Sequence, residues 1–189
     1  MTRAHGAQTF SAKSRFTSLL GATVLTAFGC SESPSSYDLT SMMNQAQKST
    51  PVSDPTGVFS TIESLDLAGA SRKAIFQHPP STITYRIKVP AGRPVFRAGV
   101  GMRPDSWDKA GDGVEFVVAV EARGERRELF RRYIDPKADP ALRRWNDIEL
   151  DLSADAGQEV KLSLITGPGP KGDPHYDWAV WGAPRIESS

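Results

Sequence analysis

Short segments in which apolar and polar residues alternate are the feature that most constrains the fold of this chain. In residues 81–89, Ile83, Tyr85, Ile87 and Val89 fall on one face and polar residues on the other. This period of two residues indicates a strand with one buried face. Further strands are predicted at 94–102, 113–122, 145–152, 159–166 and 177–186. Many short strands separated by Gly- and Pro-containing turns indicate an all-β fold, an antiparallel sandwich or barrel.

The segment 121–134 fits two structures. Leu129 and Tyr133 have the i, i+4 spacing of a helix, whereas Phe130 and Ile134 also belong to an alternating strand pattern. We predict a strand, because Gly124 stands where a hairpin turn would follow the preceding strand.

The N-terminal residues have the features of an export signal. Basic residues precede an uncharged, largely apolar stretch at 16–28. Thirteen helical residues span about 20 Å, short of the ~30 Å hydrocarbon core of a bilayer. We therefore predict a signal peptide over residues 1–29 rather than a permanent membrane span.

Cys30, the single cysteine of the chain, follows directly. Small residues before it resemble the lipobox of bacterial lipoproteins, which implies that Cys30 is lipidated. Ser31 resembles the pattern sent to the outer membrane, so the expected location is the bacterial cell envelope. The alternative is an ordinary signal peptide in which Cys30 is an unmodified thiol.

Residues 30–57 are predicted to form a lipidated flexible linker. Thirteen of the residues 31–57 are Ser, Thr or Pro and apolar side chains are sparse, so burial cannot offset the entropy of ordering. The folded domain is predicted over 58–189.

The charge balance excludes some functions. Without the first 29 residues, the chain has 20 basic and 22 acidic residues, whereas nucleic-acid binding needs a positive field. One cysteine allows no intramolecular disulfide and no zinc site built from several thiolates.

The order of several segments resembles the galactose-binding-like β-sandwich, and in particular carbohydrate-binding modules of the NPCBM type. The segments are Phe96–Met102, Gly111–Val118, Trp145–Leu152, Val160–Leu164 and Tyr176–Ile186. The resemblance covers roughly residues 74–187. It implies a jelly-roll-like sandwich that binds carbohydrate without catalysis.

The sequence offers no catalytic constellation. It contains no Gly-x-Ser-x-Gly, no His-Glu-x-x-His and no phosphate-binding Gly-rich loop. After the predicted signal peptide only His78 and His175 remain as histidine bases, and the carboxylates are scattered. We therefore predict that the protein is not an enzyme.

Two loops contain groups suited to a sugar. Trp107 offers a flat apolar face, flanked by the polar side chains Arg103 and Asp108, and His175 and Asp177 come from a later loop. These five residues form the predicted carbohydrate site. In the alternative interpretation, Trp107 folds back and caps the sandwich.

Three further hypotheses remain open. Asp173 and Asp177, with Asp112 or Asp135, provide hard oxygen ligands for a structural calcium ion. An Arg cluster at 126–144 either clamps an acidic sugar or forms a charge-balanced solvated face. The alternative function is an envelope protein-interaction or structural module, which should show a broad apolar patch instead of exposed Trp107 or Trp181.

Overall fold

The computed structural model describes residues 35–52 and 59–188. The predicted signal peptide, Cys30 and the start of the predicted linker lie outside the described residues. In the described part of the chain, no helix is long and apolar enough to cross a membrane.

Strands and single 3-10 turns make up the described elements. The strands are β1 (Ser36–Asp38), β2 (Gln47–Ser49), β3 (Ser60–Leu67), β4 (Ala70–Gln77), β5 (Ser81–Lys88), β6 (Pro94–Met102), β7 (Val114–Ala122), β8 (Glu125–Ile134), β9 (Asn146–Asp151), β10 (Glu159–Pro168) and β11 (Ala179–Ser188). The 3-10 turns are η1 (Met43–Gln45), η2 (Pro104–Ser106), η3 (Pro140–Leu142) and η4 (Ser153–Asp155).

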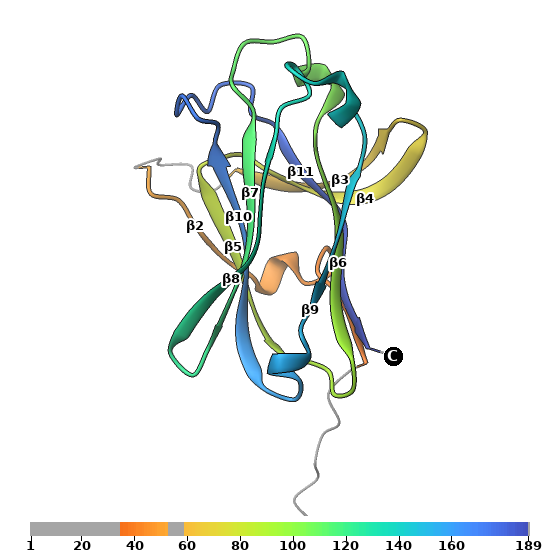
Figure 1. The fold of residues 1–189 in the computed structure, drawn as a ribbon, viewed down its shortest axis with the longest axis vertical. Coiled ribbons are helices and arrows are strands. Elements are labelled where there is room, and N and C mark those ends of the chain that lie inside the picture. The colour runs from red at the N-terminus through yellow and green to blue at the C-terminus, as the bar shows by residue number, and fades with distance from the viewer. Residues whose placement is uncertain (1–34, 53–58, 189) are drawn as a thin grey trace, which may run out of the picture. The chain divides into compact units, whose positions relative to one another are not determined.

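The strands form two antiparallel sheets (Figure 1). Sheet A has the order β3-β4-β11-β6-β9, with β1 also paired to β11, and sheet B has the order β2-β5-β10-β7-β8. The pairing is nested: β4 pairs with β11, β5 with β10, β6 with β9 and β7 with β8, alternately in sheets A and B. This nesting confirms the prediction of an all-β, jelly-roll-like antiparallel sandwich.

The alternating segments form strands close to the predicted positions. The ambiguous segment is strand β8, joined to β7 by a hairpin turn at Arg123 and Gly124, both with positive φ. The last strand begins at Ala179 rather than at Asp177, because residues 169–178 form a loop.

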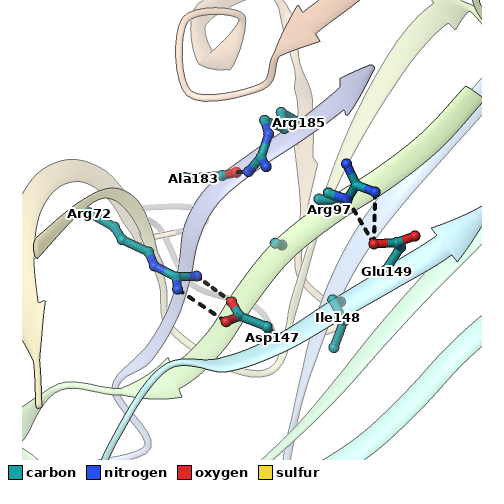
Figure 2. Close-up of a pocket in the computed structure, with 8 residues that line it drawn as sticks. Arg72, Arg97, Asp147, Ile148, Glu149, Ala183 and Arg185 are labelled. Atoms are coloured by element: carbon teal, nitrogen blue, oxygen red, sulfur yellow. Dashed lines mark hydrogen bonds and ion pairs between the residues drawn. The ribbon is translucent and has the colours of Figure 1, made fainter. Parts of the chain in front are cut away.

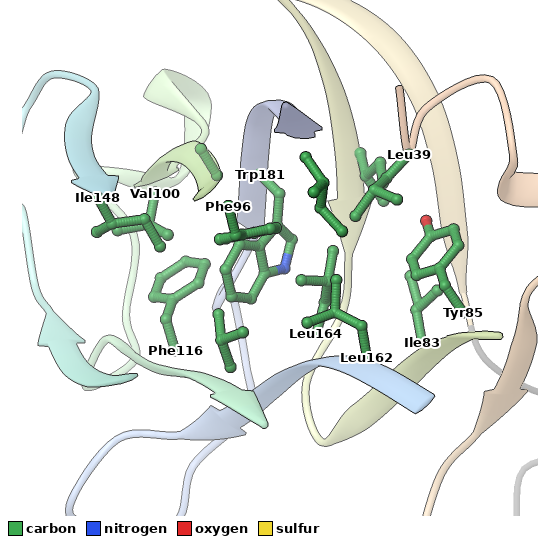
Figure 3. Packing of buried hydrophobic residues seen from close by; sticks show 14 of the residues in the cluster. Leu39, Ile83, Tyr85, Phe96, Val100, Phe116, Ile148, Leu162, Leu164 and Trp181 are labelled. Carbon is green, nitrogen blue, oxygen red and sulfur yellow. The ribbon is translucent and has the colours of Figure 1, made fainter. Parts of the chain in front are cut away.

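The core lies between the two sheets (Figure 3). Trp181 of β11 is fully buried, and its ring meets that of Phe116 of β7 edge to face, with 5.1 Å between the ring centres. Aliphatic side chains from both sheets fill the surrounding space, among them Leu162 and Leu164 of β10. Burial of these side chains is the main driving force that joins the sheets.

The prediction of a flexible linker up to residue 57 is wrong for residues 35–50. There β1 pairs with β11 of sheet A and β2 pairs with β5 of sheet B, so the segment is bonded to both sheets. We call residues 35–50 the clasp. Leu39 and Met43 between β1 and β2 are buried in the core. Tyr37, Met42 and Ala46 also pack against this core, and the sheet edges offer hydrogen-bond partners for the backbone. The folded domain therefore begins by Ser36.

The β3–β4 hairpin was not predicted either, because polar residues interrupt its apolar pattern. The hairpin extends sheet A at its edge, and on the outer face of this sheet its Phe76 joins Trp145 and Val180 in a second apolar cluster. Trp145 lies against the backbone of Gly182, where an added Cβ would come within 2.7 Å of the indole.

The clasp can be tested by Leu39→Ala. Because Leu39 is buried among core side chains, the free energy of unfolding should fall by about 2–5 kcal/mol. Val52→Ala is the control, because Val52 belongs to the same predicted linker but is exposed. Urea unfolding of both variants measures the difference. Equal stability of the two would show that residues 35–50 do not pack on the sandwich.

Candidate functional site

Three loops meet at one end of the sandwich, the upper end in Figure 1. They are residues 103–113 between β6 and β7, residues 135–145 between β8 and β9, and residues 169–178 between β10 and β11. Lys137 Nζ donates to the carbonyl of Ala110 at 2.8 Å, and the Lys171 N–H donates to the Asp112 carboxylate. We call these three segments the apical loops.

Two buried carboxylates stand at the base of the apical loops. Asp177 has no exposed surface, and Asp112 has almost none. Among the described residues, no well-aligned hydrogen bond reaches either Asp177 oxygen or Asp112 Oδ1, although the Gly113 N–H and the Lys137 ammonium lie close enough to lower the pKa of Asp177. The cation nearest to Asp177 is the largely buried Lys137 ammonium, 3.6 Å from Oδ1.

The environment of Asp177 favours its neutral form. Burial raises the pKa of Asp177 to about 7, and the nearby Asp112 adds to this rise, whereas the Lys137 ammonium opposes it. Asp177 was predicted to bind a sugar, but a side chain without exposed surface cannot contact a ligand on the surface. Asp177 instead lies buried at the base of the apical loops.

The predicted calcium ligands are placed differently from each other. The Asp173 carboxylate accepts from the backbone N–H of His175 at 3.0 Å and lies 2.5 Å from His175 Nδ1, in the outer part of the loop. Within the described ranges, no three His, Cys, Asp or Glu side chains gather as a metal site would require. In the described part of the chain, Asp173 and Asp177 are thus not joined by a third such side chain, and the Lys137 ammonium lies beside Asp177.

Trp107 is partly buried, which favours the interpretation that it caps the sandwich. Its indole N–H donates to the Met102 carbonyl at 3.0 Å, and its ring packs against both apolar clusters. The Arg143 guanidinium lies 5.5 Å from the ring centre. Asp108, the residue after Trp107, is 90% exposed, and its carboxylate lies 3.5 Å from the Arg143 guanidinium.

Arg103 belongs to a second aromatic group on the sheet A side. Its guanidinium lies between two rings, 5.7 Å from the centre of Phe76 and 5.5 Å from the centre of Trp178. The Glu63 carboxylate of β3 lies 3.3 Å from this guanidinium, and Asp105 lies 3.0 Å away. We call Phe76, Arg103, Tyr176 and Trp178 the aromatic cradle.

Tyr176 completes the cradle and faces solvent. Its ring centre is 5.8 Å from that of Trp178, and the residue is 40% exposed. Its φ is +57°, a left-handed conformation that is strained for a bulky aromatic residue. His175 beside it is 78% exposed and, with Asp173, adds polar groups next to the rings. Strained, exposed aromatic residues beside polar groups are typical of ligand sites.

The structure thus divides the five predicted residues. Arg103 and His175 lie with the cradle, Trp107 and Asp108 lie with Arg143, and Asp177 lies beneath the loops. The prediction did not include Tyr176 and Trp178, which lie with Arg103 in the cradle. A carbohydrate-binding module was expected to keep Trp107 or Trp181 exposed, but Trp107 is partly buried and Trp181 is fully buried.

A further pocket, of about 440 Å³, lies on the outer face of sheet A (Figure 2). Arg72 pairs with Asp147 there, and Arg97 pairs with Glu149 at 2.8 Å. None of the described side chains that line the pocket is aromatic. Opposite charges that are already paired and exposed gain little from a ligand, so this face is a weaker candidate than the cradle.

The predicted Arg cluster is a charge-balanced surface. Arg127 pairs with Asp155 at 2.6 Å, and Arg131 pairs with Glu115 and Glu128. These pairs favour the solvated-face interpretation over a clamp for an acidic sugar.

No protein-family model matches the chain. An uncharacterized protein of Archaeoglobus fulgidus is 42% identical over 120 residues, which are 60% of this chain and 30% of that protein. The chain therefore spans less than a third of the length of this relative.

Solved structures share the fold. A CBM51 module from Clostridium perfringens GH95, in complex with methyl-galactose, has a TM-score of 0.54 at 16% identity, over 80% of this chain and 99% of that one. CBM51-2 with INT domains from Clostridium perfringens ZmpB, in complex with GlcNAc, has a TM-score of 0.52 at 17% identity, over 82% and 32%. Tandem CBM51 modules of a Streptococcus pneumoniae family 98 glycoside hydrolase have a TM-score of 0.53 at 13% identity, over 82% and 47%. The chain thus has the β-sandwich fold of carbohydrate-binding modules, as the resemblance implied.

The raised pKa of Asp177 predicts how stability depends on pH. A carboxyl whose pKa is about 7 when folded and about 4 when unfolded binds more protons in the folded state between these values. The free energy of unfolding should therefore fall as pH rises from 5 to about 7. Melting temperatures measured across this range, with chelator present, should decline in the wild type and stay flatter in Asp177→Asn. Identical slopes for the two proteins would contradict the assignment.

Proposed function

We propose that this protein is a non-catalytic carbohydrate-binding module that holds a sugar at its apical loops. The fold supports this proposal, because modules with the same sandwich bind methyl-galactose and GlcNAc in their solved structures. The ligand-facing surface is the aromatic cradle, with His175 and Asp173 at its rim. An aromatic face packs on the C–H side of a sugar ring, and polar groups around it bond the hydroxyls.

Tyr176 is the single observation that carries the proposal. Its left-handed backbone conformation costs free energy, yet its ring stays 40% exposed and gains little burial in return. A ligand that packs on this ring accounts for both facts. Arg103 suits a neutral sugar, because Glu63 and Asp105 already balance its charge.

We further propose that a lipid on Cys30 anchors the module to the bacterial cell envelope, at the outer membrane. The support is the sequence around Cys30, which resembles a lipobox. Its partners are then envelope or neighbouring glycans, with the membrane contacted through the anchor alone.

An envelope protein-interaction module is the second candidate. Phe59, at 60% exposed, and Ile62 offer an apolar surface along the start of β3. Phe59 also meets Phe76 edge to face, with 5.4 Å between ring centres, so this surface adjoins the cradle. Binding of a protein through these residues, without any glycan, is the outcome that would favour the second candidate.

Calorimetry against a panel that includes methyl-galactose and N-acetylglucosamine tests the sugar site. Tyr176→Ala should weaken binding about tenfold or more, which is roughly 1.4 kcal/mol, because the stacking face is lost. Its melting temperature should change little, because the ring is exposed.

Trp107→Ala is the matched control for that experiment. Because Trp107 packs against both apolar clusters, the variant should lose stability and keep its affinity for sugar. Each titration is run with calcium and with chelator. Sugar binding that requires calcium would show that a metal ion binds the protein in addition to the Lys137 ammonium. Unchanged affinity in Tyr176→Ala would remove the cradle as the site.

The anchor is tested by Cys30→Ser in a diderm host. If acyl chains on Cys30 provide the membrane affinity, the variant should leave the membrane fraction or accumulate unprocessed. Fractionation and metabolic labelling with a fatty acid measure this. A normally processed variant that stays in the membrane fraction would contradict the anchor.

A further inference from the structure

A second pocket, on the sheet B side of the apical loops, is separate from the aromatic cradle. It has a volume of about 350 Å³, within the usual range of small-ligand pockets, and it is lined by Glu115, Tyr133, Pro168, Gly169 and Pro170. We call it the proline pocket. Its residues belong to β7, β8, β10 and the start of the following loop. The cradle is formed instead by Phe76 of β4, by Arg103 directly after β6 and by the end of that same loop.

Tyr133 gives the proline pocket a fixed aromatic wall. Its hydroxyl donates to the carbonyl of Asp112 and lies 3.1 Å from the Asp135 carboxylate. The residue nevertheless remains 43% exposed. A ring that is already held in place loses little conformational entropy when a ligand packs on it.

The wall formed by Pro168, Gly169 and Pro170 is also fixed before any ligand arrives. Gly169 lies directly against Asp112, and a Cβ at position 169 would come within 2.7 Å of the Asp112 carbonyl carbon. The Lys171 N–H, two residues later, bonds to the Asp112 carboxylate. Pro168 and Pro170 beside them present apolar rings and no backbone N–H groups. One buried residue, Asp112, therefore holds both walls.

Polar groups at the pocket are arranged as donors and acceptors with balanced charge. Glu115 lines the pocket and is paired with Arg131, which also bonds Glu128 through Nε at 2.8 Å. Both Glu115 and Arg131 remain partly exposed. Such a pair offers hydroxyl groups both an acceptor and donors, but it offers no unpaired positive charge to a carboxylate or sulfate.

We propose that the proline pocket is a second sugar-binding subsite, which takes one neutral pyranose on the Tyr133 ring with its hydroxyls bonded to Glu115 and Arg131. The inference rests on the proposed function, since it assigns the same ligand class to a different surface. It implies that the module binds two sugar residues on opposite flanks of the 169–178 loop. Uronic and sulfated sugars bind more weakly than neutral sugars at this subsite.

The test maps sugar binding by NMR on the full chain, with methyl-galactose, N-acetylglucosamine and galacturonate as probes. The backbone amide signals of Gly169 and Lys171 report on the proline pocket, and the indole N–H signal of Trp178 reports on the cradle. Neutral probes should shift both sets of signals, and galacturonate should shift the Gly169 and Lys171 signals less.

Matched variants separate the two sites. Tyr133→Ala should raise the Kd measured from the Gly169 and Lys171 signals at least about tenfold and leave the Trp178 titration unchanged, and Tyr176→Ala should do the reverse. Should Tyr133→Ala fail to fold, Glu115→Gln replaces it, with the same expected direction.

Each outcome decides one of the two proposals. If no probe shifts the Gly169 and Lys171 signals, or if their titration is the same in the pocket variant, the second subsite is wrong. If the Trp178 signal alone fails to respond, the cradle is wrong and the second subsite stands. If neither set responds at the highest soluble sugar concentration, both proposals fall.

Discussion

A buried hydrogen-bond network around Gln77 joins the two sheets, and the position of the apical loops depends on it. Gln77 ends β4 in sheet A without any exposed surface. The Gln77 side-chain oxygen Oε1 accepts from the Trp181 indole N–H at 2.9 Å. The side-chain nitrogen Nε2 donates to the backbone carbonyls of Ser81 and Leu164 in sheet B. Because buried polar groups are costly unless they are bonded, this network fixes how β11 lies over β10 and β5.

The Gln77 network lies a few residues from the apical loops. Buried carboxyl groups at the base of these loops also restrict the position of the loops. Asp177 lies two residues before β11 and Asp112 two residues before β7, so the ends of both sheets bring these carboxylates beneath the loops. The Lys137 ammonium from a third loop offsets part of their charge. Residues that were expected to bind ligand thus order the surface on which the proposed ligand sites lie.

The sequence predicted the parts of the fold that depend on period-two alternation. Strands such as β5 and β6 were placed correctly, because one of their faces is continuously apolar. The clasp could not be predicted in this way, since the apolar residues around Leu39 and Met43 do not alternate with polar ones and their burial depends on sheet edges formed by distant segments. The β3–β4 hairpin was missed for a related reason, because its buried apolar residues are consecutive and do not alternate with polar ones. Ile75 lies in the core between the sheets, and Ala74 and Phe76 lie in the second cluster.

The site was predicted less well than the fold, and the reason is physical. The predicted site residues were selected from loops by their chemical type. The two loops do lie at the same end of the sandwich, but the sequence did not show which side chains are exposed. Asp177 and His175 are two residues apart, yet one is fully buried and the other is exposed. The left-handed backbone of Tyr176 between them ends any alternation along the loop. No periodic pattern in the sequence encodes such a reversal.

The 169–178 loop links the two proposed subsites through its own construction. Its first residues form a wall of the proline pocket, and its last residues present the cradle. Asp112 accepts from the Lys171 N–H, and the Trp178 carbonyl accepts from the Arg103 N–H. A loop held at both ends needs little reordering when a ligand binds to either flank, so both surfaces exist before the sugar arrives. The buried carboxyl groups lie at the base of this loop, and the exposed aromatic rings lie on its flanks. Both therefore depend on how the loop packs on the sandwich.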